Sequence, residues 1–270
     1  MHRTWMKTCC RPATFRCAWV GLAGACLSLL LGCAGPGVST DEASKPASQA
    51  PVVAQRLPLV FDAADKARWE PVLLPGKLRT AFQSIKHQGR PSLQAESRAS
   101  ASMLRQRVQI APEQLGRLRF DWQVANLIEG ADMRERDSED SPVRLVLAFD
   151  GDRRQFSPRN AMLNELTRAI TGEEMPYAVL MYVWSNDQPV GTVITNPRTD
   201  RIRKIVVESG AARLQQWLRY ERQIAEDFER AFGEPPQALQ SVAIMTDTDN
   251  TRGQTKAWYG QIVLEPAGRP

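Results

Sequence analysis

The amino-acid sequence predicts an all-β protein, an antiparallel, jelly-roll-like β-sandwich with two short helices. Short runs of alternating or β-branched residues recur throughout residues 57–266, and turns rich in Gly, Pro, Asn and Asp separate them. The two segments with helical spacing do not alternate with the strands, which favours a β-sandwich over an α/β fold. The predicted domain therefore spans residues 57–266, with a short tail at 267–270.

The strand pattern is clearest in Arg117–Val124. Every second residue from Leu118 to Val124 is apolar and the residues between them are charged or polar, as in a half-buried antiparallel strand. The predicted strands, in order along the chain, are Thr80–Ile85, Pro91–Ser97, Met103–Ile110, Arg117–Val124, Val143–Asp150, Tyr177–Trp184, Val190–Thr195, Arg201–Val207, Ser241–Asp247 and Lys256–Leu264.

Two segments show helical rather than strand spacing. Ser157–Ile170 opens with a Ser-Pro pair, typical of an N-cap and the first helical residue, and it closes before Gly172. Ile224–Phe232 has apolar residues at every fourth position and ends before Gly233. Each segment is long enough for a short helix that interrupts the run of strands.

The high sequence pI of about 9.1 and the formal net charge of +5 come mostly from the first 32 residues. That segment holds four basic residues and no acidic one, so its removal lowers the net charge to +1. It also holds four of the five cysteines and one of the two histidines. Without it, Cys33 is the single cysteine and His87 the single histidine. These numbers argue against a nucleic-acid binder, a disulfide scaffold and a Cys/His zinc cluster.

Residues 1–32 have the order of an export signal. A basic start precedes an apolar run, Ala18–Leu31, that is too short to span a bilayer. The run ends in Leu30-Leu31-Gly32-Cys33, which resembles the bacterial lipobox, a motif whose cysteine is acylated after cleavage. We therefore expect a signal peptide at 1–32, a palmitate-bearing lipid anchor at Cys33, and a disordered tether at 33–56. Ala34, rather than Asp, follows the cysteine, and this resemblance implies the periplasmic side of the outer membrane.

Several segments resemble an uncharacterised family of exported bacterial proteins, the domain of unknown function numbered 3047. The resemblance rests on Gln216–Arg222, Phe232–Pro236 and above all Met245–Thr251, and it extends over residues 57–265. One departure is Glu139-Asp140, where the family leads us to expect paired aspartates. The resemblance implies an exported β protein and supplies no activity. The order of elements in the C-terminal third is also remotely similar to jelly-roll carbohydrate-binding modules, which is an analogy of architecture only.

A cluster of oxygen donors between two predicted strands suggests a metal site. Asp247, Asp249 and Asn250 offer two carboxylates and an amide, which are ligands that Ca²⁺ prefers. The spacing departs from a helix-loop-helix calcium loop, because Arg252 stands where Gly is required. The alternative is a polar hairpin turn whose side chains bond their own backbone.

Aromatic residues provide the second set of candidate ligand-binding positions. Tyr182 with Trp184 could form a flat platform for sugar rings, and Trp217 near Tyr220 another. Trp258 and Tyr259 are adjacent in a predicted strand, so their side chains point to opposite faces and we expect one of them to face solvent. Among these aromatics Tyr259 and Tyr182 are the ones we expect to be exposed. The alternative for each of these aromatics is the hydrophobic core.

The sequence holds few of the residue sets that catalysis requires. No phosphate-binding loop, dinucleotide fingerprint or nucleophile elbow is present, and His87 lies in a turn rather than near a nucleophile motif. We therefore expect a non-catalytic protein that binds a glycan or another envelope component. Two alternatives are a structural partner in an envelope complex and a polysaccharide hydrolase with paired carboxylates. The carboxylates at or near predicted strand ends are Glu96, Asp150, Glu208, Asp247 and Asp249.

Overall fold

The computed structural model describes residues 57–62 and 64–267. The predicted signal peptide, the predicted acylation site at Cys33 and the predicted tether lie outside the described residues, as does the end of the tail. Among the described helices, none combines the length and the apolar character that a membrane span requires.

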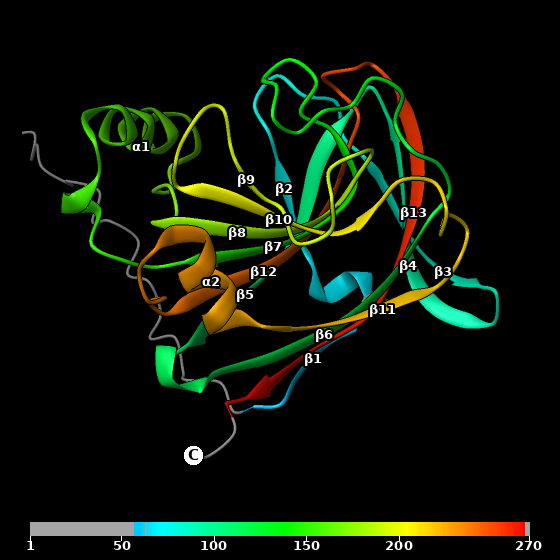
Figure 1. The fold of residues 1–270 in the computed structure, drawn as a ribbon, viewed down its shortest axis with the longest axis horizontal. Helices are drawn as coiled ribbons and strands as arrows, with labels where there is room; N and C mark the ends of the chain where they lie inside the picture. The colour runs from blue at the N-terminus through cyan, green and yellow to red at the C-terminus, as the bar shows by residue number, and fades with distance from the viewer. Residues whose placement is uncertain (1–56, 63, 268–270) are drawn as a thin grey trace, which may run out of the picture. The chain divides into compact units, whose positions relative to one another are not determined.

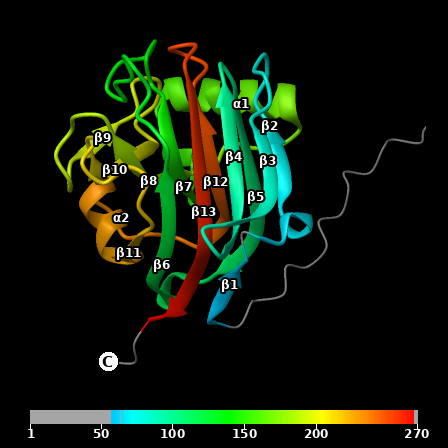
Figure 2. The ribbon, with the colours of Figure 1, turned by 90° about the vertical axis from the view of Figure 1, so that its right-hand side faces the viewer.

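The strands form two sheets that face each other (Figure 1). Sheet A has the order β11-β6-β13-β4-β3, and β1 pairs with β13. Figure 2 looks onto this sheet, with β6, β13 and β4 side by side. All its pairings are antiparallel. Its strands are β1 (Leu59–Phe61), β3 (Ala81–His87), β4 (Arg90–Arg98), β6 (Leu115–Val124), β11 (Leu218–Gln223) and β13 (Gln254–Pro266).

Sheet B has seven strands in the order β2-β5-β12-β7-β8-β10-β9. Its pairings are antiparallel with one exception: β8 and β10 run parallel. The chain between them carries β9, which turns back and pairs antiparallel with β10, so β10 must run in the direction of β8. The strands are β2 (Glu70–Leu73), β5 (Ala101–Ile110), β7 (Ser141–Phe149), β8 (Ala178–Ser185), β9 (Val193–Thr195), β10 (Ile202–Ser209) and β12 (Leu239–Asp247).

The hydrophobic core lies between the two sheets. On β7, Leu145 and Leu147 point into this core, while Arg144 and Val146 point to the outer face of sheet B. Helix α2 (Ile224–Phe232) closes one side of the sandwich with Ile224 and Phe228, which are both buried in the same core. The apolar positions of the alternating strands therefore supply most of the inner layer.

Helix α1 (Pro158–Thr171) lies on the far side of sheet B from sheet A (Figures 1 and 2). Its buried residues are polar: Asn160 bonds to Asp200 and Thr199, and Asn164 accepts from the backbone of Met175. Its apolar stripe faces solvent instead, and the side chains exposed are Met162, Leu166 and Ile170. Hydrogen bonds rather than apolar packing therefore hold this helix in place.

The predicted fold class is confirmed, since the structure is a sandwich of two β-sheets with two α-helices. Every predicted strand overlaps an observed one, and the helices begin and end within one residue of the prediction. Three short strands were not predicted: β1, β2 and β11. β2 contains Pro71 at a sheet edge, and β11 is charged at alternate positions, so neither gives a strong apolar signal.

Candidate functional site

Three of the four aromatic residues predicted to bind ligand lie in the core. Tyr182, Trp184 and Tyr259 are at most 1% exposed and pack between the sheets. The hydroxyl of Tyr182 donates to Asp227, and the indole N–H of Trp184 donates to the backbone oxygen of Gly210. Because all three side chains are buried in the core, the predicted platform of Tyr182 with Trp184 is wrong, and so is the predicted exposure of Tyr259.

The fourth residue, Trp258, points to the outer face of sheet A, as the alternation with Tyr259 predicts for one of the pair. Its ring is nevertheless buried, because the His87 imidazole stacks on it at a centroid distance of 3.9 Å. The indole N–H of Trp258 donates to the side chain of Gln94 on the neighbouring strand.

The predicted metal loop takes part in a network of buried charges on sheet B. Asp247 receives two hydrogen bonds of 2.8 Å from Arg144, and both side chains are almost completely buried. Asp249 is paired with Lys77, and Asn250 joins the group through its backbone N–H, which donates to Asp140. One oxygen each of Asp140, Asp247 and Asp249 lies within 4.8 Å of the others. The carboxylates thus already have basic or N–H partners, and calcium binding here stays a prediction.

Asp140 holds the segment 245–251, the part of the sequence most specific to the family, in its place. Its carboxylate accepts from the backbone N–H of Asn250 and from both the N–H and the hydroxyl of Thr251. Thr248, in the same segment, bonds to Ser97 through its hydroxyl. Burial raises the pKa of Asp247 to about 6 in spite of the bonds from Arg144, so its carboxylate is ionised at neutral pH. The motif therefore anchors the β12–β13 turn to the strand that starts beside Asp140.

A second ion pair extends this network. Lys204, with no exposed surface, lies 2.6 Å from Glu139 and donates to the backbone oxygen of Met133. Burial lowers the pKa of Lys204 to about 8. Glu139 also accepts from Arg198 and Asn196. We call Glu139, Asp140, Arg144, Lys204 and Asp247 the buried charge network.

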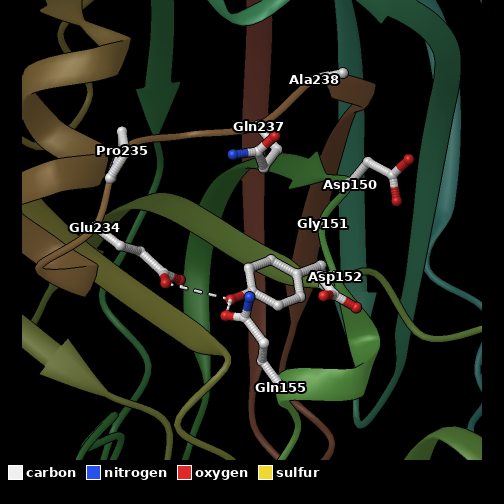
Figure 3. A pocket seen from close by; sticks show the side chains of 9 residues that line it. Asp150, Gly151, Asp152, Gln155, Glu234, Pro235, Gln237 and Ala238 are labelled. Carbon is white, nitrogen blue, oxygen red and sulfur yellow. Dashed lines mark hydrogen bonds between the residues drawn. The ribbon is translucent and has the colours of Figure 1, made fainter.

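An open pocket of about 460 Å³ lies at the end of sheet B where β7 leaves the sheet (Figure 3). We call it the polar pocket. Glu234 and Pro235 lie on one wall and Asp150 and Asp152 on the opposite one (Figure 3). The walls come from three connections: β7 to α1, α1 to β8, which supplies Tyr177, and α2 to β12. The residues that line it are Asp150, Gly151, Asp152, Gln155, Tyr177, Glu234, Pro235, Gln237 and Ala238.

Tyr177 is fixed rigidly in this pocket. Its ring is parallel to that of Phe156 at 5.7 Å, and the Arg201 guanidinium lies 4.0 Å from its centroid. Its hydroxyl lies 3.2 Å from Glu234, which in turn accepts from Arg201 at 2.7 Å. Gly151 allows this packing, because a Cβ there would approach the Tyr177 ring to 2.2 Å.

Each acidic side chain of the polar pocket has an arginine partner. Asp150 pairs with Arg153, Asp152 with Arg154, and Glu234 with Arg201. The Arg154 side chain holds the pKa of Asp152 at about 2. The three carboxyl groups, together with the carboxamides of Gln155 and Gln237, offer both hydrogen-bond acceptors and donors to a ligand.

The strand-end carboxylates predicted as hydrolase candidates do not form a free pair. Each of them is bound to a basic side chain, including Glu96 with Arg98 and Glu208 with Arg213. Sequence reasoning singled out Asp150 of the pocket but not Tyr177, Gln155, Glu234 or Gln237. Gly233-Glu-Pro-Pro236 predicted only the end of a helix. Nothing in the sequence indicated that this loop faces residues 150–155.

The comparison with family models confirms the resemblance seen in the sequence. The model of the family described as "Protein of unknown function (DUF3047)" matches residues 67–263, most of the described chain. No significant match was found among curated protein sequences.

Solved structures similar to this chain are β-sandwiches that share little sequence with it. The family 11 carbohydrate-binding module of the cellulase Lic26A-Cel5E of Clostridium thermocellum has a TM-score of 0.39 and 8% identity, covering 80% of this chain and 99% of its own. The endoglucanase cel12A of Rhodothermus marinus has a TM-score of 0.42 and 10% identity, covering 78% and 100%. A family 12 xyloglucanase from Bacillus licheniformis has a TM-score of 0.38 and 5% identity, covering 77% and 99%. These similarities assign neither a site nor an activity to this chain.

Proposed function

We propose that this chain, which belongs to the DUF3047 family, is a lipid-anchored envelope protein that binds a polyhydroxylated ligand, such as a glycan, in the polar pocket. The observation that carries the proposal is the composition of that pocket: carboxylates and carboxamides face one another around a fixed tyrosine. Sugar hydroxyls both donate and accept hydrogen bonds, so they match such a mixed set of partners.

Binding without catalysis is the better proposal for these residues. Glycoside hydrolysis by two carboxylates needs one of them protonated, with a raised pKa. In the polar pocket the Arg154 side chain lowers the pKa of Asp152 to about 2, and Asp150 and Glu234 are each held in an ion pair with an arginine. The pocket therefore supports recognition rather than proton transfer.

A double substitution of the two pocket carboxamides tests this proposal. Gln155 and Gln237 are exposed, so Gln155→Ala with Gln237→Ala should leave the melting temperature unchanged. Each lost hydrogen bond contributes about 0.5–1.5 kcal/mol, which together weaken binding about tenfold. The measurement is a glycan array followed by titration calorimetry with the best oligosaccharide. Gln261→Ala, an exposed glutamine on β13, is the matched control. If the double variant binds every oligosaccharide on the array as tightly as the unaltered protein does, the polar pocket is not the ligand site.

The proposed anchor at Cys33 is tested separately. Loss of the acylated thiol should release the protein, because stable attachment depends on the lipid chains. We expect Cys33→Ala to move from the membrane pellet to the soluble fraction and to take up no labelled palmitate. Cys26→Ala, which changes a cysteine inside the predicted signal peptide, is the control and should stay in the outer-membrane fraction. A Cys33→Ala protein that still sediments with membranes would contradict the anchor.

A further inference from the structure

The outer face of sheet A holds polar residues that are covered although they point away from the core. Ser92, Asp121 and Gln123 lie on this face, on β4 and β6, and all are buried; Gln123 is only 2% exposed. Gly260 of β13 lies among them and is buried as well. We call these four residues the floor.

The four side chains that cover the floor are the roof: His87, Arg90, Trp217 and Trp258. His87 stacks on Trp258 with a 7° angle between the rings, and its centroid lies 6.1 Å from that of Trp217. The Arg90 guanidinium lies 5.3 Å from the Trp217 ring. Cross-strand register places Trp258 directly beside Gln123, and Trp217 immediately precedes the Leu218–Trp122 pair. The two indoles thus flank Gln123 along one row of the sheet.

Polar atoms in this place lack partners. Among the described residues, six buried side-chain nitrogen or oxygen atoms have no hydrogen bond, and His87 Nε2, Trp217 Nε1 and Gln123 Oε1 are three of them. Leaving buried donors and acceptors unpaired costs free energy, so natural proteins rarely group several together. Trp217 Nε1 is a donor, His87 Nε2 can be one, and Gln123 Oε1 is an acceptor. A hydroxyl group both donates and accepts, so a hydroxyl-bearing ligand could pair with all three.

Asp121 has only weak charged partners. Arg90 and Arg219 approach its carboxylate to 3.5 and 3.8 Å, the backbone N–H of Gln261 also donates to it, and burial raises its pKa in spite of these contacts. Gly260 makes room for this carboxylate, since a Cβ at that position would lie 2.6 Å from Asp121 Oδ1. The sheet is therefore shaped to keep an acceptor with spare capacity beneath the two indoles.

The roof is carried by a hairpin tip. β3 is the edge strand of sheet A, and its tight turn to β4 has positive φ at both Gln88 and Gly89. His87 and Arg90 flank this turn as a cross-strand pair. The Trp258 ring face is thus covered by a residue at the end of an edge strand, next to this turn.

We propose that the roof is the closed state of a second binding site, which opens when the hairpin tip moves. In the open state a ring of a β-1,4-linked saccharide chain, whose equatorial substituents leave a flat C–H face, replaces His87 on Trp258. Hydroxyls of that ring accept from Trp217 Nε1 and donate to Gln123 Oε1 and Asp121. An organic cation fits less well, because it would leave the Trp217 donor unpaired and lie beside Arg90 and Arg219. The site shares no residue with the polar pocket and does not depend on that pocket's occupancy.

The test is titration calorimetry of the full chain, with cellohexaose, chitohexaose and choline as probes. At least one hexasaccharide should bind, and Trp217→Ala or Gln123→Ala should weaken that binding tenfold or more. His87→Ala should tighten it several-fold, because the closed state no longer competes with the ligand. Gln83→Ala, on the same face but outside the roof, should change nothing. The Gln155→Ala, Gln237→Ala double variant should also bind normally, which separates this site from the polar pocket.

Three results would overturn the proposal: neither hexasaccharide binds, choline binds in their place, or His87→Ala and Trp217→Ala leave the affinity unchanged. Circular dichroism and thermal melts of each variant show whether it is folded. Trp258→Ala removes a buried ring and can unfold the sheet, so the decision rests on the more exposed Trp217 and His87.

Discussion

Arg144→Met should lower the free energy of unfolding by about 3–5 kcal/mol, a large part of the total stability of a domain. Arg144 is buried and donates twice to Asp247 and once to the backbone oxygen of Glu139. Methionine fills a similar volume but leaves the Asp247 carboxylate with a single remaining donor, the backbone N–H of Ser141. The cost is that of an uncompensated buried charge rather than of lost packing.

The loss should depend on pH. The folded-state pKa of Asp247 is about 6, above its ordinary 3.8, so ionisation of this group opposes folding increasingly as the pH rises from about 4 to 6. Without Arg144 the pKa rises further, and the variant carries a larger penalty at every pH above 6. At pH 5 both proteins hold a protonated Asp247, so the difference between them should be much smaller than at pH 7.5.

Urea unfolding at pH 5 and pH 7.5 measures both effects. Arg107→Met is the matched control, because Arg107 is exposed on the same sheet and its pairs with Glu70 and Glu173 should contribute less than about 1 kcal/mol. Arg144→Met combined with Asp247→Asn should recover at least half of the loss, since the stranded charge is then gone. Equal losses at both pH values would show that electrostatics is not the cause.

The fold was predictable because alternation is a local property. In Arg117–Val124 the apolar positions alone show that the segment is a strand with one covered face. The strand β7 was also predicted, but the pattern did not show that both its faces are buried, or that its outward-pointing Arg144 belongs to the buried charge network. Local pattern shows that a residue belongs to a strand, but not what covers its outer face.

The candidate sites were harder to predict because they depend on contacts between distant segments. Asp247 and Asp249 have the spacing of metal ligands, yet the partner of Asp247 is Arg144, on another strand of the sheet. Alternation correctly separated Trp258 from Tyr259, but it could not show that His87, two strands away, covers the outward ring. For Tyr182 and Trp184 the sequence left core and platform open, and only the second sheet decides between them.

Trp184→Ala should destabilise the protein by about 3–5 kcal/mol and leave ligand affinity unaltered in the fraction that folds. The Trp184 side chain is one of the largest in the core, and it lies between the sheets with its N–H bonded to Gly210. Truncation leaves a cavity that neighbouring strands cannot collapse into, and it also leaves the Gly210 carbonyl without its donor. Urea unfolding measures the loss.

Trp217→Ala separates this effect from that of removing any tryptophan. Trp217 is only partly buried, on the outer face of sheet A, and its indole N–H has no partner to lose. Its truncation should cost less than half as much stability as that of Trp184, while its effect on oligosaccharide binding should be much greater. The opposite result would be a stable Trp184→Ala protein that no longer binds saccharide. It would show that Trp184 contacts the ligand, and it would contradict the proposal that the sugar stacks on the outer face of sheet A.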